Sequence, residues 1–206
     1  MKDPEYEAVS KAKRQAESGN PKGAVDTLES FLEKDPHNTK ARMQLAKTLV
    51  YDMKDLETGL LQMEIVLDLD PDNVEAMKAA VTVLAKHKKH NKRTVEIYEK
   101  LLAVSPDGDL YNAYAIFLRI QMIDFKNSAV YYEKAISANP KKPEYHQNYA
   151  VLLLNDLKDY RKAKDELEIL MKLDPGNESA KKNYELLMKK KFDSEGNLKK
   201  KPFLRR

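Results

Sequence analysis

Apolar positions recur along this chain with two superimposed periods. At the short period, apolar residues return every three or four positions over stretches of about fourteen residues, the spacing of one face of an α-helix. At the long period the whole pattern repeats. Five such stretches are followed by similarly placed prolines, separated by 35, 35, 34 and 35 residues: Pro36, Pro71, Pro106, Pro140 and Pro175. The pattern therefore predicts five copies of one helical unit.

Three columns of residues keep their phase relative to these prolines. A small residue stands twelve positions before each proline, a large residue eight before it, and a mostly apolar residue five before it. In chain order the columns are Ala24, Gly59, Thr94, Ser128 and Ala163; Leu28, Met63, Tyr98, Tyr132 and Leu167; and Phe31, Val66, Leu101, Ala135 and Leu170. Offsets of four and three put all of them on one helix face. We expect the small residue to let a neighbouring helix approach closely, and the large residues to fill the space beside it.

A second apolar-periodic stretch lies upstream in each copy and carries its own small or short residue. These residues are Ala12, Ala46, Val81, Ala115 and Ala150. Within a copy, this residue precedes the small residue of the second stretch by 12 positions in the first copy and by 13 in the other four. Each copy is thus predicted to be a helix, a short turn and a second helix, with the extra residue of the later copies in or near the turn.

This pattern resembles the tetratricopeptide repeat, a helix–turn–helix unit of 34 residues. The fifth copy matches best, through Tyr149, Ala150, Ala163, Leu173, Asp174 and Pro175, although the Trp characteristic of that repeat is absent from the chain. The resemblance implies an all-α, right-handed superhelical solenoid whose first helices line a concave groove. We expect repeats at about 4–38, 39–73, 74–108, 109–142 and 143–177, a capping helix at 178–191, and an unstructured basic tail at 192–206.

On that resemblance, exposed residues of the first helices would form the binding groove. The candidates are Lys13, Lys40, Met43, Lys47, Lys78, Asn112, Ile116, Arg119, Gln147 and Val151. The first half of this set is basic, which favours an extended, partly acidic peptide as the ligand. The same positions are explained equally well as solvated helix faces. Most members of a tyrosine cluster are expected in the core or at the edges of the stacked helices, with a minority as anchors for a partner: Tyr111, Tyr114, Tyr131, Tyr132, Tyr145 and Tyr149.

The net charge of +4 is concentrated at one end of the chain. Residues 181–206 contain ten Lys or Arg and three Asp or Glu, so the remaining 180 residues carry a net charge of −3. A second basic cluster, 86–93, has five basic residues in eight. A duplex-binding domain carries its cations on the folded scaffold, which this acidic body mostly lacks. Association with nucleic acid or an anionic surface, through 86–93 and the tail, is therefore the alternative function.

Catalytic and cofactor-binding motifs are absent from the sequence. The chain of 206 residues has no Cys, which excludes disulfides and thiolate chemistry, and it has no Gly-rich phosphate loop. His87 and His90 are three residues apart but stand among cations, so we expect no metal site and no other cofactor. No apolar run reaches the roughly 18 residues of a membrane span, so we expect a cytoplasmic protein with no membrane insertion.

The leading hypothesis is a non-enzymatic scaffold or adaptor that binds a protein or peptide ligand in its groove. Self-association, with the poorly matched first copy stacking on a second molecule, is a further alternative.

Overall fold

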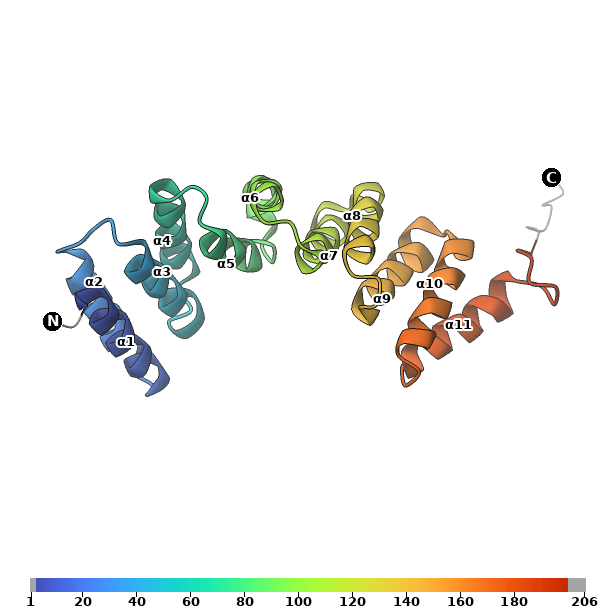
Figure 1. Cartoon of the computed structure of the whole chain (residues 1–206), viewed down its shortest axis with the longest axis horizontal. Coiled ribbons are helices and arrows are strands. Elements are labelled where there is room, and N and C mark those ends of the chain that lie inside the picture. Colours follow the sequence, from blue (N-terminus) through green and yellow to red (C-terminus); the bar gives the residue numbers. More distant parts are fainter. Residues whose placement is uncertain (1–2, 200–206) are drawn as a thin grey trace. The chain divides into compact units, whose positions relative to one another are not determined.

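The chain folds almost entirely into helices. The computed structural model describes residues 3–199, and within this range eleven α-helices follow one another (Figure 1). They are α1 (Pro4–Glu17), α2 (Pro21–Leu32), α3 (Thr39–Lys47), α4 (Leu56–Leu69), α5 (Val74–Leu84), α6 (Asn91–Val104), α7 (Gly108–Phe117), α8 (Phe125–Ala138), α9 (Pro143–Leu152), α10 (Tyr160–Leu173) and α11 (Glu178–Lys191). The described chain divides after Ser105 into two compact units, unit 1 with α1–α6 and unit 2 with α7–α11. None of the described helices is long and apolar enough to cross a membrane.

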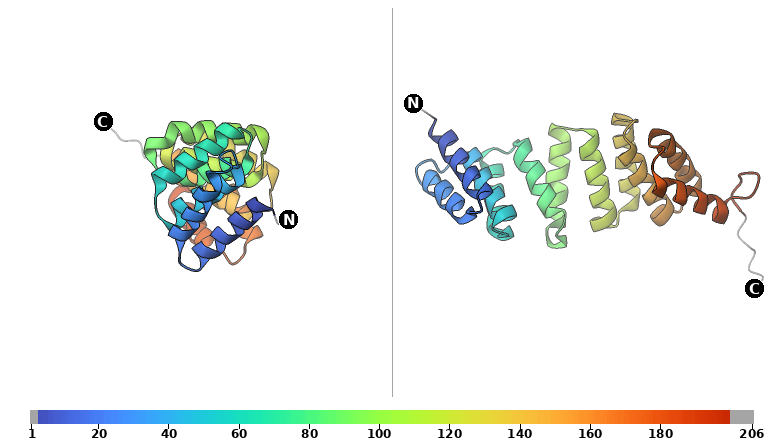
Figure 2. Two further views of the ribbon diagram at one scale, coloured as in Figure 1. Left: turned by 90° about the vertical axis from the view of Figure 1, so that its left-hand side faces the viewer. Right: turned by 90° about the horizontal axis from the view of Figure 1, so that it is seen from below.

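Neighbouring helices pack as pairs. In unit 1 the pairs are α1 with α2, α3 with α4 and α5 with α6; in unit 2 they are α7 with α8 and α9 with α10, and α11 packs on α10 (Figures 1 and 2). The predicted columns form the contacts. Every member of the small column is buried, and so is every member of the large column. In the third column every member is buried except Phe31, which is half-buried. The neighbouring Leu32 takes the buried position in that copy.

The small residues mark where the two helices of a pair come closest. A Cβ atom added to Gly59 would lie 2.4 Å from Cγ2 of Val50 and 3.0 Å from the carbonyl oxygen of Ala46. In the equivalent place of unit 2, the Ser128 hydroxyl donates a hydrogen bond to the carbonyl oxygen of Ala115 at 2.8 Å. The small column of the second helix therefore lies against the small column of the first, as the spacing predicts.

In the copies whose two small residues are 13 positions apart, the extra residue is accommodated where the first helix ends. In three of these copies the last turn widens into a π-helical segment: Thr48–Asp52, Leu118–Met122 and Leu153–Leu157. Each segment is followed within two residues by a side chain held in the left-handed region, at Lys54, Ile123 and Lys158, with φ of 60°, 56° and 57°. An aspartate then accepts a backbone hydrogen bond to cap the second helix: Asp55, Asp124 and Asp159. The shorter first copy has no π segment and turns at Gly19, with φ of 82°. The third copy turns through a 3₁₀ segment, Lys88–His90.

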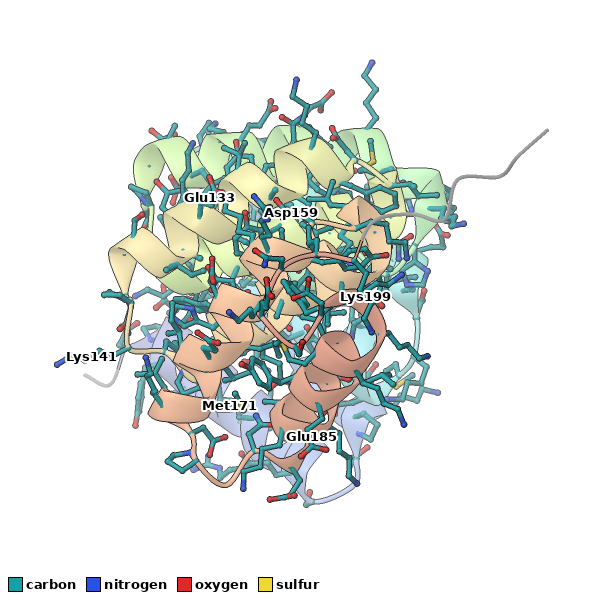
Figure 3. All side chains as sticks on the ribbon, turned by 90° about the vertical axis from the view of Figure 1, so that its right-hand side faces the viewer. Glu133, Lys141, Asp159, Met171, Glu185 and Lys199 are labelled. Atoms are coloured by element: carbon teal, nitrogen blue, oxygen red, sulfur yellow. The ribbon has the colours of Figure 1, made fainter. Side chains whose placement is uncertain are left out.

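The core of unit 2 extends beyond α11 into a short hairpin. Phe192 and Leu198 form an isolated antiparallel bridge, and Oδ1 of Asp193 accepts backbone hydrogen bonds from Glu195 at 3.0 Å and Asn197 at 2.8 Å. Phe192 is buried in the cluster that contains α10 and α11, and Leu198 packs against it. Figure 3 looks onto this end of the chain and shows Lys199 of the hairpin beside α11.

The hairpin corrects the expectation of an unstructured tail. That expectation is wrong for residues 192–199, because one aromatic side chain in a polar, Lys-rich segment finds a place in the core. The rest of the expected tail, 200–206, lies outside the described residues.

Candidate functional site

The basic candidates of unit 1 face carboxylates on neighbouring first helices. The Lys40 ammonium on α3 lies 3.0 Å from a Glu5 carboxylate oxygen on α1, and the Lys47 ammonium lies 2.6 Å from a carboxylate oxygen of Glu75 on α5. The Asn38 amide also donates to Glu5, and Asn38 and Lys40 together lower the pKa of the Glu5 carboxyl. These bonds tie α1 to α3 and α3 to α5, so Lys40 and Lys47 are already paired.

The repeat register contains the signal for this pairing. Glu5, Lys40 and Glu75 are 35 residues apart, so they occupy one column of the repeat with alternating charge. Of the remaining lysines, Lys13 and Lys78 are exposed, and Lys13 adds to the effect of Lys47 in lowering the pKa of Glu75. Because carboxylates share the surface with these cations, unit 1 is less basic than the list of candidates suggests.

Two candidates are wrong as solvent-facing residues. Met43 and Asn112 each keep only 5% of their surface exposed. Met43 is buried because α3 packs against three helices (α1, α2 and α4), so that most of its circumference is covered. Asn112 on α7 is buried against α9, where its side-chain oxygen accepts a hydrogen bond from the Asn148 amide at 3.1 Å.

The polar candidates of unit 2 connect successive repeats. The Arg119 guanidinium donates to a carboxylate oxygen of Asp156 at 2.5 Å, and both side chains are about four-fifths buried. The Gln147 side-chain oxygen accepts a hydrogen bond from the Asn177 amide, at 3.4 Å. Together with Asn112, these residues hold one first helix against the next. Their polar groups are therefore committed to the fold.

The tyrosine cluster belongs mainly to the core, as expected. Four of its six members are at most 3% exposed: Tyr114, Tyr132, Tyr145 and Tyr149. Burial raises the pKa of Tyr132 and of Tyr149 to about 12, so both hydroxyls stay protonated even in moderately alkaline solution. The Tyr149 hydroxyl donates to a carboxylate oxygen of Glu133 at 2.6 Å. Tyr111 and Tyr131 are half-buried and lie side by side.

The first helices of unit 2 also present apolar side chains to solvent. Ile116 and Val151 are half-buried at equivalent positions 35 residues apart, and Leu186 on α11, another 35 residues on, is 49% exposed. Ile120, one turn after Ile116, is 58% exposed. We call Ile116, Ile120, Val151 and Leu186 the apolar row. The sequence prediction included Ile116 and Val151 but missed the other two, although the 35-residue register leads directly from Val151 to Leu186.

A pocket of about 350 Å³ adjoins the Leu186 end of the apolar row. It lies where the π segment after α9, the first residue of α10 and the carboxy-terminal half of α11 meet. Its lining includes Leu154, Tyr160, Leu186, Lys158, Lys190 and Lys191. The Lys191 ammonium lies over the Tyr160 ring, 4.6 Å from its centre. We call this the terminal pocket; its apolar side chains alternate with Asn155, Asn183 and a cationic rim.

The basic segment 86–93 is partly neutralised. Lys89 pairs with Glu57 of α4, and Arg93 lies 3.9 Å from Glu64 and 3.4 Å from Glu96. These contacts weaken the argument for an anionic partner at 86–93. Within residues 3–199, no group of three or more His, Asp or Glu side chains is arranged as metal ligands would be.

Comparisons with known proteins agree on the fold. No family model matches the sequence, and no curated protein matches it. Among solved structures, MamA from Desulfovibrio magneticus RS-1 is similar with a TM-score of 0.72 and 20% identity, over 86% of this chain and 99% of that one. YrrB, described as a TPR protein with an unusual peptide-binding site, is similar with a TM-score of 0.63 and 20% identity, over 80% of this chain and 84% of that one.

A third structure carries the repeat in its name. A tetratricopeptide repeat protein from Parabacteroides merdae ATCC 43184 gives a TM-score of 0.74 at 15% identity, over 90% of this chain and 72% of that one. Sequence identities this low establish the architecture alone. Together with the burial of the small and the large column in all five copies, these structures confirm the predicted fold: the chain has the all-α tetratricopeptide-repeat fold.

Proposed function

We propose that this protein is a non-catalytic interaction module that binds a segment of a partner protein along the first helices of unit 2. The observation that carries the proposal is the apolar row, in which Ile116, Val151 and Leu186 recur at repeat spacing and Ile120 lies one turn after Ile116. Ile120 and Leu186 are 58% and 49% exposed although each belongs to a well-packed helical unit. Exposed apolar side chains that line up on one surface are typical of interaction sites.

The surroundings of the apolar row favour binding without rearrangement. The Asn148 amide donates to Asn112 between α9 and α7, and Arg119 donates to Asp156 between the π-helical segments that follow these helices, so the two are held in register beneath the row. A surface that is rigid before binding loses little conformational entropy when a ligand arrives. The likeness to YrrB supports a peptide as the ligand, since that protein is described as having a peptide-binding site.

Unit 1 is proposed as a secondary, polar contact region. Its candidates Lys13 and Lys78 are exposed; Lys40 pairs with the half-buried Glu5 and Lys47 with the exposed Glu75, and an acidic ligand could replace these carboxylates. Ion pairs with a solvent-exposed member are screened by water and contribute little to stability, so exchanging them for ligand carboxylates costs little.

A selection from a random peptide library displayed on phage, with the full chain immobilised, tests the proposal. Each recovered peptide is then measured by fluorescence anisotropy against Ile120→Asp and Leu186→Asp. We expect each substitution to weaken binding at least about tenfold, since it places a charge where an apolar side chain of the ligand was buried.

Matched controls lie on the second helices. Val130 on α8 and Ile169 on α10 are 43% and 38% exposed, so Val130→Asp and Ile169→Asp make the same chemical change outside the apolar row. Peptides that bind all four variants equally well, or a library that yields no binder, would refute the proposed function.

A further inference from the structure

The geometry points to the terminal pocket as a subsite for one large apolar side chain flanked by carboxylates on a partner peptide. This inference rests on the proposed function and names the ligand chemistry for one end of the apolar row. The evidence consists of the shape and walls of the pocket, the charges on its rim, and the residue found at the turn beside it.

The walls suit a single large apolar side chain. Leu154 and Tyr160 are half-buried, and Leu186 is half-exposed at the mouth. The volume of about 350 Å³ is at the small end of the range for ligand sites. A leucine or phenylalanine side chain with its adjoining backbone fits that scale, whereas a larger cofactor would extend well beyond it.

The rim carries uncompensated positive charge. Among residues 3–199, no carboxylate lies within ion-pair distance of Lys158 or Lys190. The two carboxylates nearest to Lys158 in the sequence are already engaged, since Asp156 binds Arg119 and Asp159 caps α10 through the Lys162 backbone amide. Lys158 and Lys190 therefore lack carboxylate partners among the described residues, and ligand carboxylates would supply them. The third rim lysine, Lys191, lies over the Tyr160 ring.

The turn itself does not explain Lys158. Its φ of 57° lies in the left-handed region, where glycine is the residue of lowest strain. The π-helical turn requires this conformation in three repeats, but it does not require a lysine there. Lys54 holds the same position in the second copy, so this turn accommodates a lysine, and at Lys158 it brings a cation to the pocket.

The same charges argue against the chain's own end as the occupant. Residues 200–206 include Phe203 and Leu204, which have suitable apolar side chains, but Lys200, Lys201, Arg205 and Arg206 accompany them. Four cations brought to a rim of three lysines would repel one another. An acidic segment from a partner protein is therefore the better occupant.

The peptides recovered from the display library test this inference. We expect enrichment of Asp or Glu next to Leu, Ile or Phe. The double variant Lys158→Glu/Lys190→Glu should bind these peptides at least about tenfold more weakly, and binding to the unaltered chain should weaken as salt is raised. The matched control is Lys126→Glu/Lys172→Glu, which reverses two exposed lysines of unit 2 outside the pocket lining and should bind normally.

The possible outcomes separate this inference from the proposed function. Peptides that lose affinity for Leu186→Asp and Ile120→Asp but bind Lys158→Glu/Lys190→Glu normally would overturn the acidic subsite and leave the proposed function standing. A synthetic peptide of residues 200–206 that binds the unaltered chain, and loses affinity for Leu186→Asp, would replace the partner by the chain's own end and overturn the inference. Association with phosphatidylserine vesicles that the double variant abolishes, without any peptide binder, would also overturn it.

Discussion

His146 and Glu166 form a buried pair that should make the stability of unit 2 depend on pH. The His146 side chain is 3% exposed, its Nδ1 lies 2.6 Å from a carboxylate oxygen of Glu166, and its Nε2 lies 2.9 Å from the carbonyl oxygen of Pro140. Both ring nitrogens face acceptors, so the protonated imidazolium can donate on both sides. The Glu166 carboxylate, followed by the Pro140 carbonyl, raises the pKa of His146 above its usual value.

The direction of the raised pKa determines the sign of the pH effect. Because the folded state holds the proton more tightly than the unfolded chain, the stabilisation is complete below the unfolded pKa of about 6.5 and is lost as pH rises through the higher folded pKa. Glu166→Gln keeps the size of the side chain and removes its charge. A hydrogen bond to a charged group is worth about 1.5–3 kcal/mol. Since Glu166 is only 13% exposed, we expect Glu166→Gln to lower the free energy of unfolding by about 2 kcal/mol at acidic pH.

Urea unfolding of the unaltered chain and of Glu166→Gln, followed by circular dichroism at about pH 5.5 and about pH 9, measures the effect. Amide hydrogen exchange in α9 reports on unit 2 separately from unit 1. Glu185→Gln is the matched control, because Glu185 is an exposed glutamate on α11 (Figure 3). The difference between the unaltered chain and Glu166→Gln should shrink as pH rises. An equal difference at both pH values, or one that grows with pH, would refute the reasoning.

Three further substitutions test the packing and the turns. Ile123→Gly should raise the free energy of unfolding by about 1 kcal/mol, because φ of 56° strains a β-branched residue that is 64% exposed; a lower urea midpoint would contradict this. Ala163→Leu should lower it by about 1–3 kcal/mol through overpacking at a position with no exposed surface, whereas Ala138→Leu at an exposed end of α8 should change it little. Phe192→Ala should cost about 3 kcal/mol and increase hydrogen exchange in α11, since Phe192 is 4% exposed in the unit 2 core; unchanged exchange would show that the hairpin does not stabilise the unit.

The helices and their core faces could be predicted from local pattern alone. A helix face repeats every three to four residues regardless of what packs on it, so columns such as Ala24 with Leu28 appear in the sequence with their spacing intact. The distance between Ala115 and Ser128, at 13 residues, likewise indicated an extra residue in the turn. It did not indicate a π-helical ending with Ile123 in the left-handed region, because several turn geometries can absorb one residue.

The binding surface was harder to predict because it depends on helices that are distant in sequence. Whether Lys40 is available to a ligand depends on how α1 places Glu5, and whether Asn112 is exposed depends on how closely α9 approaches α7. A few degrees of helix rotation decide such contacts, and the pattern along one helix does not contain that angle.

The repeat number, the helix order and the buried columns thus follow from the sequence, since each is a consequence of helix geometry within one unit. The ion pairs between repeats, the burial of Phe192 and the terminal pocket arise where separate helices meet. Their existence depends on side-chain positions that are set only when the helices pack together.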